Sequence, residues 1–596
     1  MSKTLILYTR DPMDSDIYDR KLAYSMHLAL KSGDEYIPLN HNSGVFFAKA
    51  TENEDGSLNP KSLKAPYAFK LADGGYGIIS VRTEPDGRQD ETDKGSVLIA
   101  VTEDFLHYKE IGTIRISDKE IEKAAATYCE KGGAYKITFI SGGEKKLFKL
   151  SDLNSLKGEP VEGCACGDIA PEIENTGIEG AHPSCQIEID DSIADKLLKK
   201  LITPKNIAIE VPKEKTVRCP GCIAAIRAKA VYSDGSVDEK RVDWDISGVD
   251  FTKPGRYEIE GTVHQDHFDF PIAENRADPC MARWQGKYYF IATDDSSHEK
   301  NIYIRCADSI PELVHAPEHK ILDAFTYPDI GGLLWAPELH EIGGRLYIFH
   351  AATPGPFFNE ESHIMVLKDG GDPTKAEDWS RPVRVAKADG SDLAEAGKTI
   401  TLDMTTFSWN NADYAVWSQR EFLPKDLGAW LYIAKLDSDN PTRLASEPLV
   451  LSKPDYGWAN NHTFVDEGPF ALIRDGKLWL SFSSAAVDTT YVVSFLTLEE
   501  GKDPLVISNW VKANYPAMTS RCVEGEFGTG HNAYVTDDDG KVYNTYHARP
   551  GMKAPRSAGV RRVHFDCYNE PVLDMTEEMD VKPELEKVKT TVIVKG

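Results

Sequence analysis

Three carboxylates occupy comparable points of a sequence unit that recurs along the chain, and they could carry acid–base chemistry. Glu467 precedes a Gly-Pro turn and a pair of short strands, an arrangement that fixes a side chain yet keeps it accessible. Asp278 precedes Pro279 in another copy, and Asp403 lies in a third. Of two carboxylates that face one pocket, one can protonate a leaving oxygen while the other deprotonates water, and a third charge can raise the pKa of the acid. Such a set of carboxylates can hydrolyse glycosidic bonds.

Each acid can also be explained without a catalytic role. Most Asp and Glu residues before a turn are only solvated, and Glu467 alone would indicate little. The repetition of similar units on both sides of it favours a functional role. Asp413 competes with Asp403 for the third position, but it precedes an aromatic strand and a turn explains it. We therefore assign the third role to Asp403.

The elements that must position these acids are short strands in a repeating order. From about residue 270 to 574, a strand that ends near a polar residue is followed by a glycine turn and an aromatic strand, about every 60 to 70 residues. Five copies fit this interval, as in the blades of a β-propeller. Because the innermost strands of a propeller converge, residues at equivalent positions meet around one central funnel.

A degenerate copy of the unit lies near the N-terminus. Ala65-Pro66 aligns with Asp278-Pro279, so a methyl group stands where the second copy has a carboxylate. A methyl group cannot accept a proton, and the N-terminal copy is therefore predicted to be non-catalytic.

The whole chain is predicted to be all-β, with four parts. Residues 1–165 form a β-rich region that resembles degenerate propeller blades, and residues 166–204 form a connector with one amphipathic helix at 192–201. Residues 205–269 alternate in short strands, as in a small β-sandwich. Residues 270–596 form the five-bladed propeller.

Composition limits the function classes. The 596 residues are 41% hydrophobic and can bury a large core, whereas the net charge of -27 argues against binding to nucleic acid or to an anionic membrane. The N-terminus has no apolar run of signal-peptide length and no apolar stretch is long enough to span a membrane, so we expect a cytoplasmic protein.

The ten cysteines are scattered, which suits reduced thiols rather than a disulfide framework. Only five form a loose cluster, and its pairs lie far apart without a histidine partner, which does not favour a zinc site. These are Cys164, Cys166, Cys185, Cys219 and Cys222.

From about residue 270 to 575 the chain resembles glycoside hydrolase family 43, whose members are five-bladed propeller enzymes. The resemblance covers about half of the chain and rests on motifs in the expected order: Arg276-Ala277-Asp278-Pro279, Trp335-Ala336-Pro337-Glu338, Glu467-Gly468-Pro469, Gly530-His531-Asn532 and Tyr546-His547-Ala548-Arg549. It implies an inverting mechanism with Asp278 as general base, Glu467 as general acid and Asp403 as pKa modulator. Residues 205–269 resemble bacterial Ig-like modules found on carbohydrate-active proteins.

The same resemblance implies further site residues. Substrate-binding roles fall on Trp335, Glu338, Trp458, His547 and Arg549, although a tryptophan can equally pack within a blade and Arg549 can simply neutralise the acidic funnel.

His531 is expected near the propeller axis. There it would contact a structural Ca²⁺ or Na⁺, or serve as a satisfied core histidine. No cofactor is required.

The resemblance implies an exo-glycosidase that removes terminal α-L-arabinofuranosyl residues from plant-wall-derived oligosaccharides. A β-xylosidase with the same acids is the first alternative, because one sequence does not reveal pocket shape. A non-catalytic carbohydrate-binding propeller is the second, and the presence of all three acids disfavours it. A scaffold whose Ig-like module is the working part is the third. The expected partner is an arabinose- or xylose-containing oligosaccharide, with no nucleic acid and no membrane.

Overall fold

The computed structural model describes residues 2–161, 169, 173, 175–353 and 355–595. Strands dominate it, in agreement with the predicted all-β class. The chain divides into two compact units. The first comprises Met1–Leu197, Phe270–Val535 and Thr545–Gly559, and the second comprises Leu198–Asp269, Thr536–Asn544 and Val560–Gly596.

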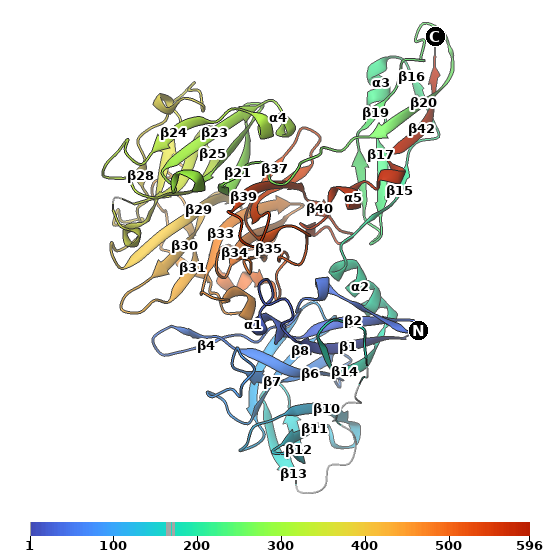
Figure 1. Cartoon of the computed structure of the whole chain (residues 1–596), viewed down its shortest axis with the longest axis vertical. Coiled ribbons are helices and arrows are strands. Elements are labelled where there is room, and N and C mark those ends of the chain that lie inside the picture. The colour runs from blue at the N-terminus through green and yellow to red at the C-terminus, as the bar shows by residue number, and fades with distance from the viewer. Residues whose placement is uncertain (1, 162–168, 170–172, 174, 354, 596) are drawn as a thin grey trace. The chain divides into compact units, whose positions relative to one another are not determined.

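Five antiparallel sheets follow one another in chain order and form the predicted five-bladed propeller (Figure 1). The first is β21 (Arg276–Trp284), β22 (Lys287–Asp294), β23 (Asn301–Ala307) and β24 (His319–Asp323), and the second is β25 (Leu334–Ile342), β26 (Arg345–Ala352), β27 (Glu361–Val366) and β28 (Val383–Arg384). The third is β29 (Thr399–Trp409), β30 (Ala412–Glu421), β31 (Gly428–Lys435) and β32 (Leu449–Ser452). The fourth is β33 (Asp466–Arg474), β34 (Lys477–Ser484), β35 (Val492–Glu499) and β36 (Val511–Lys512), and the fifth is β37 (Phe527–Thr536), β38 (Val542–Arg549) and β39 (Ser557–Arg562).

Neighbouring blades pack through apolar faces. Ile291 and Ile304 of the first sheet share one buried cluster with Leu346 and Ile348 of the second. These alternating aliphatic residues explain why the strands form, since one face of each sheet must be buried against the next.

The first strand of each blade contains a residue in the left-handed backbone region. The φ angles are positive at Asp278 (50°), Ala336 (43°), Asp403 (53°), Gly468 (54°) and His531 (53°). In the first four blades the pairing register shifts at this point, as in a β-bulge. Such a conformation is unfavourable for a non-glycine residue and re-aims the side chains beside it. The bulge is therefore the device that presents selected side chains of the innermost strands.

The N-terminal part of the first unit contains three four-stranded antiparallel sheets. Their strands are β14 (Ala181–Asp190), β1 (Ser2–Arg10), β2 (His27–Ser32) and β3 (Glu35–Pro38); β6 (Ser62–Lys70), β7 (Tyr76–Thr83), β8 (Ser96–Thr102) and β9 (Lys109–Arg115); and β10 (Lys123–Cys129), β11 (Ala134–Ser141), β12 (Glu144–Asp152) and β13 (Lys157–Val161). β6 has its own bulge at Ala65, where φ is 49°. Ala65 thus has the backbone conformation of Asp278 but carries a methyl group, as its alignment predicts.

Two boundaries differ from those expected. The connector was predicted to begin at residue 166, yet β14 lies within it and pairs with β1. The predicted helix that follows is α2 (Asp191–Leu201). The chain end was predicted to belong to the propeller, yet β42 (Lys587–Val594) pairs with β20 (Gly255–Val263) and with β16 (Glu214–Val217) in the second unit. Pairing between strands so distant in sequence leaves no local signal.

The second unit is a small sandwich of two sheets. One has the order β15 (Asn206–Glu210), β17 (Ala228–Tyr232), β18 (Val237–Lys240), and the other has the order β16, β42, β20, β19 (Val242–Trp244). The short helix α3 (Pro220–Ala224) covers one end of its core, in which Ile223, Ile259 and Val592 are buried together. The predicted β-sandwich is thus present, with β42 as an additional strand.

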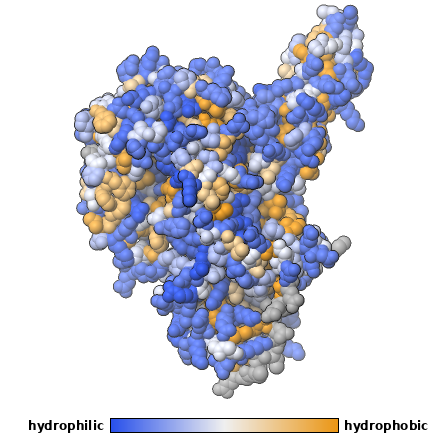
Figure 2. Space-filling view, viewed as in Figure 1, coloured by the Kyte–Doolittle hydropathy of each residue, from blue (hydrophilic) through white to orange (hydrophobic). Residues whose placement is uncertain are grey.

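Hydrophilic residues dominate the face seen in Figure 2, and hydrophobic residues occur there in small scattered groups. Among the described residues, no helix has the length and apolar character needed to cross a membrane.

Candidate active site

A pocket of about 380 Å³ lies in the first unit, and the three predicted acids line it together. Asp278 comes from the first blade, Asp403 from the third and Glu467 from the fourth, so residues far apart in sequence converge as expected. The volume suits a small ligand such as one sugar unit.

Asp278 is held as a carboxylate. Thr293 Oγ1 donates a 2.7 Å hydrogen bond to Asp278 Oδ2, and Arg556 Nη1 donates to Oδ1 at 3.2 Å. Burial alone would raise the pKa of Asp278, but the Arg556 guanidinium and the neighbouring His531 and His547 hold it well below the usual value. Asp278 is therefore ionised at neutral pH and able to accept a proton.

Glu467 has the opposite electrostatic setting. Burial raises the pKa of Glu467 to about 7, the hydrogen bond from Tyr491 opposes this rise, and the charge of Asp278 adds to it. The Tyr491 hydroxyl donates to Glu467 Oε1 at 2.7 Å. A carboxyl group with such a pKa carries a proton in a large fraction of molecules at neutral pH, as a general acid requires.

Asp403 contacts the backbone directly after Glu467. Its Oδ2 accepts a 3.1 Å hydrogen bond from the N–H of Gly468, the residue after Glu467. Burial, then repulsion from Glu467 and Asp278, raises the pKa of Asp403 well above its usual value. Asp403 and Glu467 therefore titrate as an interacting pair, in which neither loses its proton independently of the other.

Arg556 is a pocket-lining residue that the sequence reasoning missed. It lies between β38 and β39, and its other two nitrogens bind Asp295 at 3.1 and 2.9 Å. The bidentate contact fixes the guanidinium beside Asp278. Tyr491 was missed as well. Both lie outside the strand pattern, and no periodic signal marks them.

Comparison with known proteins identifies the family of this chain. A family model described as glycosyl hydrolases family 43 matches residues 268–566, just over half of the chain. The chain belongs to this family. A second model, the bacterial Ig-like domain (group 4), matches residues 227–266. Both predicted resemblances are confirmed, and the family 43 chain is a glycoside hydrolase.

Several relatives have arabinofuranosidase in their names. An extracellular exo-alpha-(1->5)-L-arabinofuranosidase of Streptomyces chartreusis is 33% identical over 285 residues, which is 47% of this chain and 82% of the relative. Alpha-L-arabinofuranosidase B of Pyricularia oryzae is 32% identical over 282 residues, 47% of this chain and 55% of the relative. Among solved structures, an alpha-L-arabinofuranosidase from Lactobacillus brevis is 29% identical, covering 51% of this chain and 95% of its own, with a TM-score of 0.45.

Two of the predicted substrate-binding residues line the pocket. Trp335 lies next to the bulge of β25, and its ring centroid is 5.7 Å from that of Phe357, another lining residue. Arg549 also lines the pocket, but its nitrogens donate to the carbonyl oxygens of Ala554 (2.7 Å) and Val487 (3.0 Å). The Arg549 guanidinium is thus tied to the backbone of the pocket wall.

Trp458 does not line the pocket, in contrast to its predicted role as a sugar contact. It is fully buried, its ring centroid lies 5.6 Å from that of Tyr456, and its indole N–H donates to Asn514 O at 3.0 Å. Its apolar area serves the core, which is the alternative that large aromatic residues in blades favour.

Glu338 and His547 also lie outside the pocket lining. Glu338 is buried and its Oε2 lies 2.6 Å from His340 Nε2. His547 is buried with its ring parallel to that of Tyr491, and its Nδ1 is 3.1 Å from Asp278 Oδ1. His547 therefore contacts Asp278 from behind the pocket wall.

His531 lies in the pocket, where a cation was predicted. Its Nδ1 is 3.2 Å from Asp278 Oδ1, and its Nε2 is buried without a partner. Within the described parts of the chain, however, no set of three converging His, Cys, Asp or Glu ligand atoms includes His531. Calcium prefers six to eight oxygen ligands, which these side chains do not supply. The ion stays a prediction that the side chains alone do not support.

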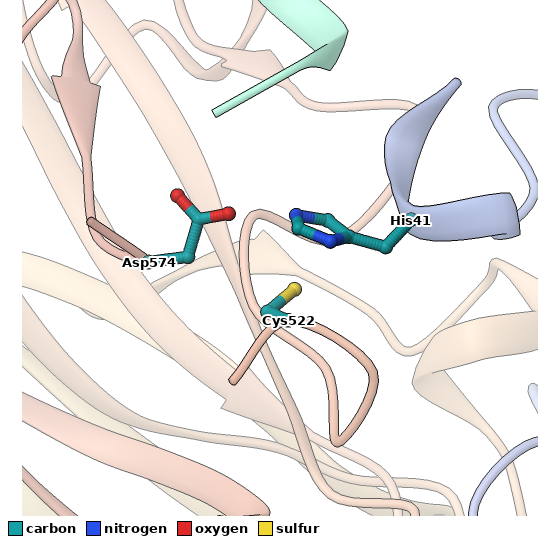
Figure 3. Close-up of side chains that lie close together, drawn as sticks. All are labelled: His41, Cys522 and Asp574. Atoms are coloured by element: carbon teal, nitrogen blue, oxygen red, sulfur yellow. The ribbon is translucent and has the colours of Figure 1, made fainter. Parts of the chain in front are cut away.

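Three other potential metal ligands, His41, Cys522 and Asp574, are drawn in Figure 3. They do not form one site within one unit, because His41 and Cys522 belong to the first unit and Asp574 to the second. In the second unit, Asp574 accepts a 2.6 Å hydrogen bond from Thr203. We assign no metal to this group.

Proposed function

We propose that this protein is an exo-acting α-L-arabinofuranosidase that removes terminal arabinofuranosyl residues from plant-wall-derived oligosaccharides with inversion. One observation carries the proposal: Asp278, whose pKa is held well below its usual value, and Glu467, whose pKa is raised to about 7, line the same pocket. The names of the curated relatives support the choice of arabinose. The small pocket volume supports removal of single terminal units.

In the proposed reaction, Asp278 takes a proton from water while the water attacks the anomeric carbon. Thr293 and Arg556 keep the accepting carboxylate oriented and charged. Glu467 gives its proton to the departing glycosidic oxygen, and the breaking C–O bond leaves its electrons on that oxygen. Tyr491 keeps the Glu467 carboxyl group in place. Repulsion between Asp403 and Glu467 favours retention of a proton by this buried pair.

Hydrolysis of a panel of nitrophenyl pentosides tests the proposal. We expect α-L-arabinofuranoside to be cleaved with the highest kcat/KM, and β-D-xylopyranoside far more slowly. A preference for the xyloside would replace the proposal by the β-xylosidase alternative. Binding of arabino-oligosaccharides by the folded protein without hydrolysis of any glycoside would replace it by a carbohydrate-binding propeller.

A further inference from the structure

The second unit carries a pair of neighbouring exposed thiols, Cys219 and Cys222, that the proposed function does not use. Cys219 directly precedes α3, and Cys222 lies within it, in the sequence Cys219-Pro220-Gly221-Cys222. Their Sγ atoms are 3.1 Å apart. The turn is fixed by a 3.1 Å hydrogen bond from the Cys222 N–H to the Cys219 carbonyl oxygen.

This geometry lies close to that of a disulfide. The S–S bond is about 2.05 Å long, so the sulfur atoms need to approach by only about 1 Å, and small side-chain rotations are sufficient. The hydrogen bond from the backbone at Arg218, followed by that from the Cys219 thiol, lowers the pKa of Cys222. A lowered pKa increases the fraction of thiolate, which is the reactive form.

A closed zinc site fits these thiols less well. Among the residues that the structure describes, no third His, Cys, Asp or Glu ligand atom joins the pair. Cys185, which the sequence places in the same loose cluster, is buried in the first unit against the backbone of Ala68. Cys164 and Cys166 lie outside the described residues.

We propose that Cys219 and Cys222 form a reversible disulfide when the protein meets a low-molecular-weight disulfide. The Cys222 thiolate attacks one sulfur of that compound, forms a mixed disulfide and releases one small thiol. The Cys219 sulfur then attacks the Cys222 sulfur and releases the second small thiol. Both cysteines are oxidised, the small disulfide is reduced, and the two protons end on the released thiols.

Peptide mass spectrometry of the full-length protein tests this proposal. After treatment with oxidised glutathione, alkylation and trypsin digestion, residues 219–227 form one peptide that contains both cysteines. We expect this peptide to lack alkyl groups and to have lost two hydrogen atoms, and dithiothreitol should restore the alkylatable dithiol. A wild-type peptide that remains a dithiol, or that carries two glutathione groups, would overturn the proposal.

Two variants test the order of the two steps and the choice of cysteines. Cys219→Ser should stop at the mixed disulfide on Cys222, because no second thiol can resolve it. Cys129→Ser is the matched control, since Cys129 is an exposed thiol in the first unit, and its loss should leave the internal disulfide unchanged.

The N-terminal region (residues 1–165) contacts the loop at residues 485–491. This loop borders the pocket through Val487 and ends at Tyr491, the hydrogen-bond partner of Glu467. Thr490 fixes the loop internally, since its N–H donates to Asp488 Oδ1 at 2.7 Å.

Residues of the N-terminal region hold this loop from outside. Thr489 Oγ1 donates to the carbonyl oxygen of Asp16. His462 bridges the two parts, with its Nε2 3.2 Å from Asp19 Oδ2 and its Nδ1 2.7 Å from Asp488 Oδ2. Asp19 also caps α1 (Arg20–Ala23) by accepting from the Lys21 N–H at 3.0 Å.

The same two parts share a core. Tyr18, Leu22 and Phe47 of the N-terminal region belong to one buried cluster with Trp458 and Phe482 of the propeller. The N-terminal segment is thus packed against the propeller, and its contacts with the loop are backed by buried apolar area.

We infer that the N-terminal region, through Asp19 and the Asp16 carbonyl, positions Tyr491 and so tunes the general acid. This inference rests on the proposed glycosidase function but not on the choice of sugar. Asp19 and Thr489 are positioning residues, since neither lines the pocket.

The pH dependence of kcat tests this inference on whichever nitrophenyl glycoside the wild type hydrolyses. Because the Tyr491 hydrogen bond lowers the pKa of Glu467, loosening Tyr491 should move the alkaline limb to higher pH and lower kcat several-fold. We expect this in Thr489→Val and Asp19→Asn, in the direction that Tyr491→Phe also takes. The other charged groups facing Glu467, namely Asp278, Asp403, Arg556 and Arg420, are unchanged in these variants.

Asp34→Asn is the control, because Asp34 is exposed in the turn between β2 and β3, and it should behave as the wild type. Folded Thr489→Val and Asp19→Asn proteins with an unmoved limb and full kcat would overturn the inference. Absence of any hydrolysis by the wild type would instead overturn the proposed function.

Discussion

Arg556 Nη1 lies 3.2 Å from Asp278 Oδ1, while the rest of the guanidinium binds Asp295. The same positive charge lowers the pKa of Glu467 as well as that of Asp278. One arginine therefore acts on both proposed catalytic carboxyl groups, although neither Asp278 nor Glu467 is close to it in sequence.

Replacement of this arginine should move both limbs of the pH profile. In Arg556→Gln the positive charge is lost, so the pKa values of Asp278 and Glu467 both rise. Activity requires an ionised base and a protonated acid, and the acid and alkaline limbs of kcat/KM should therefore both shift to higher pH. Arg549→Gln is the contrast, because Arg549 binds backbone oxygens and should leave the acid limb in place. Unmoved limbs in Arg556→Gln would remove its electrostatic role.

Removal of the acid or the base should nearly abolish turnover while the protein remains folded. General acid or base assistance is worth about 10²- to 10⁴-fold, so Asp278→Asn and Glu467→Gln should each lose at least that factor on a natural oligosaccharide. A dinitrophenyl glycoside has a leaving group that needs no proton. Glu467→Gln should thus lose far less rate on it, whereas Asp278→Asn should lose as much on both substrates. Equal losses of Glu467→Gln on both substrates would count against Glu467 as the acid.

The wild-type pH profile should reflect the two carboxyl environments. With the pKa of Asp278 held well below its usual value, the acid limb should lie below the ordinary range of aspartic acid. The alkaline limb should lie near pH 7, where Glu467 loses its proton. Asp403→Asn removes the interacting partner, so the pKa of Glu467 should fall and the alkaline limb should move to lower pH. An unmoved limb with full activity would exclude the modulating role of Asp403.

The repeated blade signature explains why the propeller and its acids could be predicted. Each of the first four copies carries its own strand, turn and bulge, and Asp278 and Asp403 both occupy the bulge that recurs in these blades. Such information is local in sequence. Arg556 and Tyr491 lie in connections whose paths depend on contacts with distant strands, and β42 pairs with strands more than three hundred residues away. These features follow only from the assembled structure.

The tryptophans show a second limit of sequence reasoning. Trp335 and Trp458 have the same side chain and both lie near blade motifs, yet one lines the pocket and the other is fully buried. Trp335 lies in β25 beside its bulge, which re-aims the neighbouring side chains, whereas Trp458 lies in a short 3₁₀ turn (Gly457–Ala459) between β32 and β33. Residue type alone therefore cannot distinguish a sugar contact from a core contact.

This difference gives a paired prediction. Trp458→Ala should destabilise the protein by about 3–5 kcal/mol, because a large aromatic side chain leaves a cavity in the core. Trp335→Ala should leave the unfolding temperature nearly unchanged and raise KM for the glycoside. Thermal unfolding and steady-state kinetics of both variants check this. An increase in KM for Trp458→Ala at a temperature where it is folded, without loss of stability, would restore Trp458 as a substrate contact.

The stereochemical course of the reaction gives the last prediction. In an inverting enzyme the base must leave room for a water molecule, and no covalent bond forms between the enzyme and the sugar. The setting of Asp278 fits this role, since its hydrogen bonds to Thr293 and Arg556 keep it ionised and ready to accept a proton. Proton NMR of the first-formed sugar should therefore show the β anomer released from an α-L-arabinofuranoside, before mutarotation. In Glu467→Gly, azide or another small anion should not yield a glycosyl azide of retained configuration, because that product forms only when the anion attacks a covalent glycosyl-enzyme intermediate. First-formed α anomer from the wild type would instead assign Asp278 as a nucleophile that forms a covalent intermediate.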